Sequence, residues 1–450
     1  TFRRLRAAAG AALPALVVLL TILSLAIPSL AQAVPASPSA LPVLYVDKDA
    51  AEGGDGTSWE TAYRYLHDAL EHATGGQIWV AEGVYYPDEG DGQTDGDRTH
   101  SFRLVKGVAV YGGFNGTETS VGERNWATNV TVLSGDLDQN DTTDGDGVVV
   151  DPANIVCTGE DDCDNSYHVV TASDVSLSAE LNGFVITAGV ADGSDLENYD
   201  KGAGIYSDDA TPTLIHLVVR GNKADSEGGG MFSTSGSPSF TNVTFRNNLA
   251  TVRGGGFSTS ASDGGISNLA FYNNEAGTSG GGMYLDTSTG QSLSNLTFNG
   301  NTAVTGGGLY AYAIGPSTLS NSTFTSNTAE DGGGLYLDAQ DLDVSSTTFA
   351  TNTASDQGGG IFAELGNYTL TGVTLNSNQA GAEGGGLYGE MNVLHVVNSV
   401  LTGNTSVLGG GIYVDDDGLS IYGLTVSGTD LIANTASGEE SSIAGGWNNT

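Results

Sequence analysis

Basic residues are scarce in this sequence of 450 residues. It has 14 Lys and Arg against 53 Asp and Glu, a formal net charge of -39, and no Lys or Arg follows Arg253. A protein that binds double-stranded nucleic acid needs a basic surface to contact the phosphates. This acidic surface would repel them, so we predict no nucleic-acid partner.

Cysteine is nearly absent as well. Cys157 and Cys163 are the only two, and both lie in one acidic stretch. So few soft ligands argue against a zinc site. In a secreted protein, where disulfides persist, two cysteines this close predict a local disulfide.

Long apolar runs are missing except at the N-terminus. There, three arginines precede an apolar run over residues 7–30, and Ala31-Gln32-Ala33 fits a small-x-small cleavage site. This order predicts a signal peptide over residues 1–33, cleaved after Ala33, and hence a secreted or cell-surface protein. The alternative is an uncleaved membrane anchor, since the run is long enough to span a bilayer. Its two prolines disfavour a continuous helix. We expect no membrane span in the mature part.

Glycine is abundant, with 67 residues, and it recurs periodically. Glycine triplets begin every 26 residues, with one interval of 25, and a degenerate copy begins at Gly202. The triplets begin at Gly228, Gly254, Gly280, Gly306, Gly332, Gly358, Gly384 and Gly409. Such a fixed period is the signature of a repeat architecture.

Residues alternate in character after each triplet begins. The fourth position is always apolar, as in Leu309 and Leu335, and the sixth is small or apolar. The fifth is mostly aromatic and the seventh is often acidic. A period of two predicts a strand, with the fourth and sixth positions inward and the fifth and seventh outward.

A second signature, Phe or Leu followed three residues later by Asn, lies further along each copy. Three residues before that Phe or Leu is a column in which Asn alternates with Gly. Its members are Asn242, Asn268, Asn295, Asn321, Ser346, Gly372 and Asn398. Asn and Gly both tolerate positive φ, so the column predicts a left-handed bend between two strands.

These patterns predict an all-β fold, a parallel β-helix with coils of about 26 residues. A copy this short cannot bury its own apolar face, whereas stacked copies can. An amphipathic helix over residues 60–73 is expected to cap the first coil. We divide the mature chain into a cap with irregular coils (34–201), regular coils (202–436) and the start of a further coil (437–450). The protein is therefore expected to continue beyond residue 450.

The Gly-Gly-Gly-apolar-Tyr and Phe-x-x-Asn repeats over residues 200–436 resemble bacterial polymorphic outer-membrane-protein repeats. Residues 43–135 resemble bacterial surface β-helix proteins, through Ile78-Trp79-Val80-Ala81-Glu82-Gly83-Val84-Tyr85 and Tyr111-Gly112-Gly113-Phe114. The resemblance implies a right-handed, pectin-lyase-like β-helix at the cell surface. It does not imply one activity, because such proteins range from adhesins to polysaccharide-acting enzymes.

The aromatic fifth position is the first candidate ligand-binding site. An outward column would expose rings on six consecutive coils, with acids two positions further on. These are Tyr284, Tyr310, Tyr336, Phe362, Tyr388 and Tyr413. Exposed rings can pack against sugar faces while carboxylates accept hydrogen bonds from hydroxyls. The alternative is a self-stacking ladder that only stabilises the fold.

An oxygen-rich loop is the candidate metal site. Asp136, Asp138 and Asn140 have the opening spacing of an EF-hand, and Asp144 and Asp146 follow. The match then fails, because the twelfth position is Gly. Calcium is the expected ion, and a solvated acidic loop is the alternative.

We interpret the protein as a secreted or cell-surface binding, adhesion or structural module for a glycan or a surface protein. The alternative is a polysaccharide lyase or glycoside hydrolase. β-Elimination in this fold commonly uses Arg or Lys as its base, and hydrolysis needs two carboxylates around one bond. Because Lys and Arg end at Arg253, an enzyme site would lie in the irregular coils before residue 254.

Overall fold

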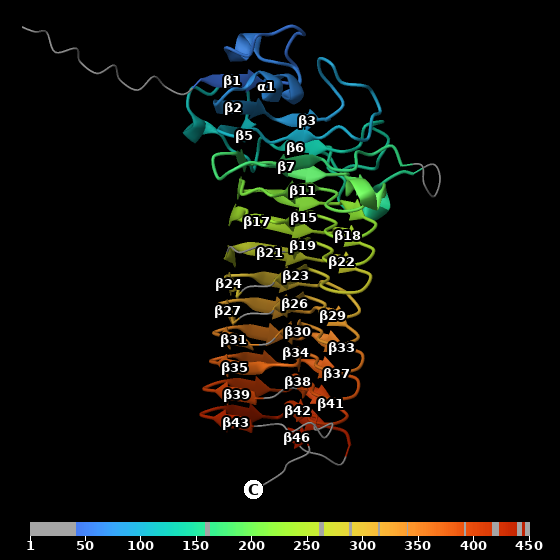
Figure 1. Cartoon of the computed structure of the whole chain (residues 1–450), viewed down its shortest axis with the longest axis vertical. Helices are drawn as coiled ribbons and strands as arrows, with labels where there is room; N and C mark the ends of the chain where they lie inside the picture. The colour runs from blue at the N-terminus through green and yellow to red at the C-terminus, as the bar shows by residue number, and fades with distance from the viewer. Residues whose placement is uncertain are drawn as a thin grey trace, which may run out of the picture. The chain divides into compact units, whose positions relative to one another are not determined.

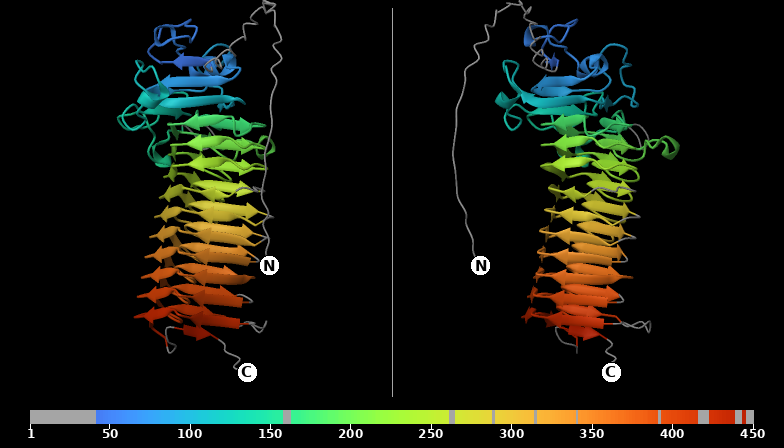
Figure 2. Two further views of the ribbon diagram at one scale, coloured as in Figure 1. Left: turned by 90° about the vertical axis from the view of Figure 1, so that its left-hand side faces the viewer. Right: turned by 60° about the vertical axis from the view of Figure 1, so that its left-hand side comes forward.

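The computed structural model describes residues 42–450, apart from 158–162, 261–264, 288–289, 314–315, 340, 391–392, 416–422, 439–442 and 446–450. Within this part, short strands stack coil upon coil into a column (Figure 1). Figure 2 shows that the strands of successive coils lie above one another on each face. The strand pairs of the described residues are parallel, for example β30 with β34, in which Leu335 pairs with Ile361 one repeat later. The predicted all-β parallel β-helix is confirmed.

Two twelve-stranded sheets run along the column. The first, which we call the tyrosine sheet, comprises β4 (Phe102–Arg103), β7 (Val170–Ser173), β11 (Ile205–Asp208), β15 (Met231–Thr234), β19 (Phe257–Ser260), β23 (Met283–Thr287), β26 (Leu309–Ala313), β30 (Leu335–Ala339), β34 (Ile361–Glu364), β38 (Leu387–Glu390), β42 (Ile412–Val414) and β46 (Ile443–Gly445). The second, the phenylalanine sheet, comprises β3 (Gly83–Tyr85), β6 (Thr131–Ser134), β9 (Val185–Thr187), β13 (Val218–Arg220), β17 (Val243–Arg246), β21 (Leu269–Tyr272), β25 (Thr297–Asn299), β28 (Thr323–Thr325), β32 (Thr348–Ala350), β36 (Thr374–Asn376), β40 (Val400–Thr402) and β44 (Asp430–Ile432).

The third face is divided between two sheets. The N-terminal sheet comprises β1 (Val43–Val46), β2 (Gly76–Ala81), β5 (Val108–Phe114), β8 (Glu180–Asn182), β12 (Thr213–Ile215) and β16 (Ser239–Thr241). The C-terminal sheet comprises β20 (Ile266–Ser267), β24 (Ser292–Ser294), β27 (Ser317–Ser320), β31 (Asp341–Ser345), β35 (Asn367–Thr371), β39 (Val393–Val397) and β43 (Gly423–Ser427). Two-residue strands complete most coils: β10 (Val190–Ala191), β14 (Lys223–Ala224), β18 (Leu249–Ala250), β22 (Glu275–Ala276), β29 (Thr328–Ala329), β33 (Thr353–Ala354), β37 (Gln379–Ala380), β41 (Thr405–Ser406) and β45 (Thr435–Ala436).

The core is a set of identical positions repeated along the column. The apolar fourth position is buried in every copy, and Leu309 and Leu335 are both 0 % exposed. The sixth position is buried as well, so both inward predictions are confirmed. Behind them, the phenylalanines of the second signature stack face to face from coil to coil, with ring centroids 4.6–5.3 Å apart. Each coil therefore adds one layer to a continuous apolar core that runs along the column.

The predicted left-handed bend is confirmed at every position of its column. Its φ angles lie between 48° and 63°, and even Ser346 adopts φ 48°. Residues other than Gly and Asn rarely adopt this region of φ. The bend separates the strand of the N-terminal or C-terminal sheet from the strand of the phenylalanine sheet, so it fixes one corner of the coil.

The N-terminal helix is shorter than predicted. In place of one helix over residues 60–73, a 3₁₀ turn (Trp59–Thr61) precedes α1 (Leu66–His72). The prediction was wrong between them because Tyr63 pairs with β1: its N–H donates to Tyr45 O and its carbonyl accepts from Asp47 N–H, both at 2.9 Å. α1 packs against β1, β2 and β4 at the start of the column. Three further 3₁₀ turns are Val121–Glu123, Pro152–Asn154 and Asp195–Glu197. In the described part, no helix has the length and apolarity that crossing a membrane requires.

A ladder of asparagines, all buried except the half-buried Asn434, runs through the column. We call it the asparagine ladder; it comprises Asn222, Asn248, Asn274, Asn301, Asn327, Asn352, Asn378, Asn404 and Asn434. Each side-chain Nδ2 donates to Oδ1 of the next asparagine at 2.8–3.0 Å. The backbone N–H of Asn301 donates to the same Asn327 Oδ1, and Asn327 Nδ2 also donates to Phe298 O. The ladder thus satisfies buried backbone groups and links each coil to the next.

We expect Asn327→Ala to destabilise the whole stack. The substitution removes the acceptor for two N–H groups of Asn301 and the donor to Phe298 O. Because a buried group left unpaired costs about 1–3 kcal/mol, the free energy of unfolding should fall by roughly 2–4 kcal/mol. Urea denaturation measures it. Asn376→Ala, at an exposed position of β36, is the matched control and should change it by less than about 0.5 kcal/mol. Equal effects of the two substitutions would contradict a structural role for the ladder.

Candidate functional site

The aromatic fifth position lies in the tyrosine sheet and forms a continuous stack. From Tyr284 to Tyr413, successive ring centroids are 4.5–5.7 Å apart and the ring planes are nearly parallel. Tyr388 is 0 % exposed, Phe362 5 % and Tyr284 7 %, whereas the other three rings are half-buried. The expectation of an exposed strip is therefore wrong, because each ring covers the faces of its neighbours.

We call Tyr284, Tyr310, Tyr336, Phe362, Tyr388 and Tyr413 the tyrosine column. The phenols of Tyr310, Tyr336 and Tyr388 hydrogen-bond to acids of the seventh position. Tyr310 Oη donates to Asp338 Oδ2 at 3.2 Å, and Tyr388 Oη donates to Glu390 Oε1 at 2.7 Å. Burial, together with the neighbouring acids, raises the pKa of the tyrosines, that of Tyr284 to about 12. Burial and the charge of Asp338 also raise the pKa of Glu364. The phenols remain protonated donors at neutral pH and hold the acids in place.

This arrangement limits what the column can do. Sugar rings could not pack on aromatic faces that are already stacked. Only ring edges and carboxylates face outward, which matches the structural ladder that was the alternative. Ligand binding by these six residues stays a prediction.

The oxygen-rich loop is held by its own hydrogen bonds. Asp136 is 5 % exposed, and its carboxylate accepts from the backbone N–H groups of Asn140 and Asp141 at 3.0 and 3.2 Å. Asp144 Oδ1 accepts from the N–H of Asp146 at 3.0 Å. Among the described residues, no three Asp, Glu, His or Cys side chains converge as metal ligands. The carboxylates of Asp136 and Asp144 are instead engaged with backbone N–H groups of their own loop. Calcium binding stays a prediction, which melting curves with calcium and with chelator would test.

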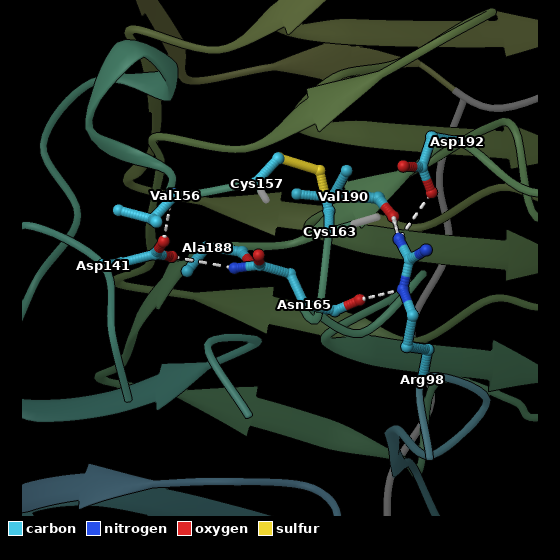
Figure 3. Close-up of a disulfide and its surroundings, with 9 residues drawn as sticks. All are labelled: Arg98, Asp141, Val156, Cys157, Cys163, Asn165, Ala188, Val190 and Asp192. Atoms are coloured by element: carbon cyan, nitrogen blue, oxygen red, sulfur yellow. Dashed lines mark hydrogen bonds and ion pairs between the residues drawn. A yellow bond between two sulfur atoms is a disulfide. The ribbon is translucent and has the colours of Figure 1, made fainter. Parts of the chain in front are cut away.

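The disulfide prediction is confirmed: Cys157 and Cys163 are bonded, with Cα atoms 4.2 Å apart. Figure 3 shows the polar groups around this bond. Asp141 accepts hydrogen bonds from Val156 N at 2.6 Å and from Asn165 Nδ2 at 2.8 Å. Burial raises the pKa of Asp141 to about 6. These contacts of Asp141 join the residues on either side of the disulfide.

The basic residues that an enzyme site would need are largely engaged in the fold. Arg98 contacts Asp192 at 2.5 Å and donates to Asn165 O at 2.6 Å (Figure 3). Lys201 pairs with Asp195 at 3.3 Å, and Arg253 lies 3.9 Å from Glu227 and 4.9 Å from the Tyr284 ring centroid. Such contacts fix these side chains as structural cations and leave them poorly placed to act as a base.

One cavity brings two cations together. It measures about 520 Å³ and lies between α1 and the segments that follow β4 and β7. Arg103, Lys106, His67 and Glu71 line it, above buried apolar residues that include Leu104. The sequence confined the basic residues of an enzyme site to the region before residue 254 but gave no reason to single out Arg103.

An aromatic cluster that was not predicted lies on the outer face of the N-terminal sheet. Trp126 is 40 % exposed and stacks on His216, with ring centroids 4.2 Å apart. The Arg124 guanidinium lies 4.9 Å from the centroids of both Trp126 and Tyr111. It donates to Asn182 Oδ1 at 2.7 Å, so the cluster is fixed. We call these five residues the Trp126 face.

Polar groups border the Trp126 face. Glu180 Oε1 accepts from Asn182 Nδ2 at 2.8 Å, and Asn242 Nδ2 lies 3.2 Å from His216 Nε2. Burial and the charge of Arg124 lower the pKa of His216, so its ring is neutral at pH 7. The face therefore combines an exposed, rigid ring with amide, carboxylate and imidazole groups. The sequence signal for it was a tryptophan in an irregular region, two positions after an arginine.

The comparisons bear on the fold. Residues 231–431 match the family model of the right-handed beta helix region. The predicted right-handed β-helix is confirmed for these coils. Comparison with curated proteins gave no match. Among solved structures, the A-module of the mannuronan C-5 epimerase AlgE6 of Azotobacter vinelandii is similar, covering 85 % of this chain and 93 % of its own. Its 15 % identity and TM-score of 0.31 carry no argument about activity.

We expect Glu364→Gln to stabilise the protein at pH 7. A raised pKa in the folded state means that ionisation of Glu364 opposes folding, so stability is lost as the pH rises through that pKa. Glutamine removes the charge and keeps an acceptor for the Tyr336 phenol. The free energy of unfolding should rise by no more than about 1 kcal/mol, as is usual for partly exposed charges. The difference should vanish as the pH falls below about 4, where glutamate becomes protonated in both the folded and the unfolded state.

Urea denaturation at both pH values measures this effect. Asp343→Asn is the matched control, because it removes one charge at an exposed position of β31, outside the tyrosine column. If the control stabilises the protein as much as Glu364→Gln, the effect is general charge repulsion and the local interpretation is contradicted.

Proposed function

We propose that this protein is a secreted or cell-surface β-helix that binds a neutral glycan through the Trp126 face. One observation carries the proposal: Trp126 is exposed, yet its ring is fixed by His216 and Arg124. The signal-peptide pattern supports the location, and the regular coils would serve as the rigid support.

The chemistry of the Trp126 face suits a sugar. Aromatic rings bury the apolar face of a ligand, while nearby polar groups fix its orientation. A ring that is already immobilised loses little conformational entropy on binding. Glu180 and Asn242 supply acceptors and donors for hydroxyl groups at the border of the face. The net charge of -39 disfavours polyanionic glycans, so a neutral glycan is the expected ligand.

The second candidate function is a polysaccharide-cleaving enzyme. The 520 Å³ cavity supports it, because Arg103 and Lys106 meet His67 and Glu71 there. A lyase would need one such side chain in its neutral form to take a proton beside a uronate, and a second, charged one to hold the carboxylate. An assay for new reducing ends and unsaturated products on uronate polymers tests this candidate in the same preparation.

We expect Trp126→Ala to weaken glycan binding by about tenfold, because the stacking contribution of one ring and its buried area are lost. A glycan array identifies the ligand, and calorimetry then measures the affinity. Tyr312→Ala is the matched control, since Tyr312 is 37 % exposed but lies on the regular coils. Circular dichroism confirms that both variants fold.

Two results would contradict the proposal. The first is an array on which no neutral glycan binds. The second is a bound glycan whose affinity Trp126→Ala leaves unchanged, or which Tyr312→Ala weakens equally.

A further inference from the structure

A second cavity, of about 380 Å³, lies on the N-terminal coils beside α1. Its lining is dominated by carboxylates from three segments that are separated in the sequence: Glu52, Asp68, Asp88, Glu89, Asp91 and Asp95. The phenols of Tyr63 and Tyr65 also line it. We call this cavity the acidic pocket. It shares no residue with the Trp126 face.

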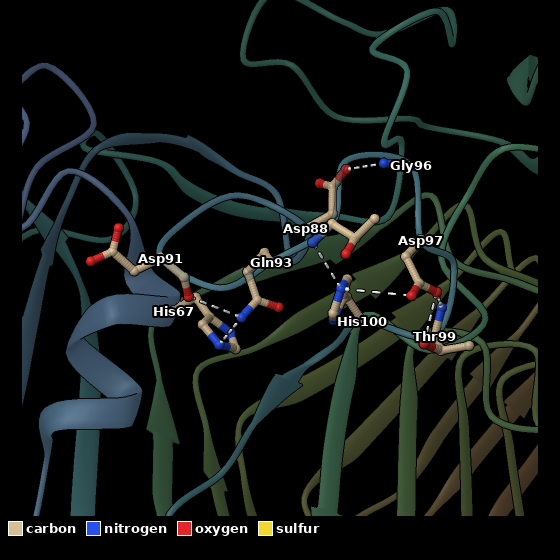
Figure 4. A network of polar contacts seen from close by, with 9 residues as sticks. His67, Asp88, Asp91, Gln93, Gly96, Asp97, Thr99 and His100 are labelled. Carbon is tan, nitrogen blue, oxygen red and sulfur yellow. Dashed lines mark hydrogen bonds and ion pairs between the residues drawn. The ribbon is translucent and has the colours of Figure 1, made fainter.

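Asp88 is the unusual member of the acidic pocket. It is 6 % exposed, and its Oδ2 accepts from the Gly96 N–H at 2.9 Å (Figure 4). Its Oδ1 is buried and has no hydrogen-bond partner among the described residues. An unpaired polar atom removed from water is costly, and a charged one more so. A ligand that donates to this oxygen would recover that cost.

The negative charges of the other carboxylates in the acidic pocket are only partly balanced by hydrogen bonds and by one cation. Asp68 Oδ1 accepts from the Asp91 N–H at 2.8 Å. Arg64 is the one Lys or Arg that lines the pocket; it lies 3.7 Å from Glu52 Oε1 and 5.7 Å from the Tyr65 ring centroid. Its position illustrates how a planar cation can contact a carboxylate and a phenol ring here. Burial also raises the pKa of Asp88 and of Glu89, which indicates that their negative charges are poorly stabilised.

The spacing of the carboxylates argues for a ligand larger than a metal ion. Within the part of the chain that the structure describes, no three acidic, His or Cys side chains converge tightly enough to hold one. The carboxylates instead surround a space of several hundred cubic ångströms. An organic cation can fill such a space while it donates hydrogen bonds to several carboxylates, and tyrosine faces attract cations.

We propose that the acidic pocket binds an organic cation, a primary ammonium or guanidinium group, with Asp88 as its buried acceptor. Two sources carry this chemistry: a Lys or Arg side chain of a protein, and the free amine of an amino sugar. The proposal is independent of glycan binding at the Trp126 face, so either can fail alone.

Calorimetric titration of the whole protein at 150 mM salt, near physiological ionic strength, tests it. The probes are acetyl-Gly-Lys-Gly-amide and glucosamine. Their uncharged counterparts are acetyl-Gly-Gln-Gly-amide and N-acetylglucosamine. We expect at least one cationic probe to bind and neither counterpart to do so. Binding of the peptide alone assigns a protein source, and binding of glucosamine alone assigns an amino sugar; either supports the pocket.

The variants locate the binding. Asp88→Asn and Glu89→Gln should each weaken it, Asp88→Asn by about tenfold, because a charge-assisted hydrogen bond is lost. Arg64→Gln should tighten it several-fold, because the competing cation is removed. Asp343→Asn, which removes one exposed charge elsewhere, should leave it unchanged. If Asp88→Asn does not fold, the opposite shifts of Glu89→Gln and Arg64→Gln still test the site.

Three results would overturn the proposal. One is the absence of binding by both cationic probes at millimolar concentration. Another is equal weakening by Asp343→Asn, which would indicate general attraction to an acidic protein. The third is unchanged or weaker binding in Arg64→Gln.

Discussion

The asparagine ladder is the interaction on which the rest of the structure depends. Each buried amide needs its partner one coil away, so all coils must keep the same rise and the same register at this corner. The ladder continues between Asn404 and Asn434, which are 30 residues apart rather than 26. Extra residues are therefore accommodated elsewhere in the coil, and surface loops can vary while the core does not.

The repeat made the fold predictable because its physics is local and periodic. Alternation placed Leu309 and Leu335 inside, and the Asn and Gly column gave the left-handed bend, including Ser346. The tyrosine column shows the limit of that reasoning. Its direction was predicted correctly, but its exposure was not, because large rings repeated at the spacing of a parallel sheet cover one another. Tyr63 shows a second limit: its pairing with β1 is a long-range contact that no helical pattern reveals.

The candidate sites were harder to predict because they join distant segments. Trp126 and His216 lie 90 positions apart in the sequence, and Trp126 precedes the repeat, whereas His216 lies in its degenerate first copy, one repeat before Asn242. The acidic pocket combines residues from positions 52 to 95 around a helix whose start was itself predicted incorrectly. The metal loop was the reverse case. Its candidate ligands are close in the sequence, but Asp136 and Asp144 accept hydrogen bonds from backbone N–H groups of their own loop.

The ladder also has a direction. Every Nδ2 donates toward the following coil and every Oδ1 accepts from the preceding one, so the side-chain amide dipoles are aligned head to tail along the column. The two ends of the stack are therefore chemically different, as are the two ends of an α-helix. For the amide–amide bonds alone, a coil removed from the C-terminal side leaves Nδ2 donors unpaired, whereas one removed from the N-terminal side leaves Oδ1 acceptors unpaired. The second bond of each Nδ2, to a carbonyl of the preceding coil, runs the other way. Assembly of the column is thus polar as well as repetitive.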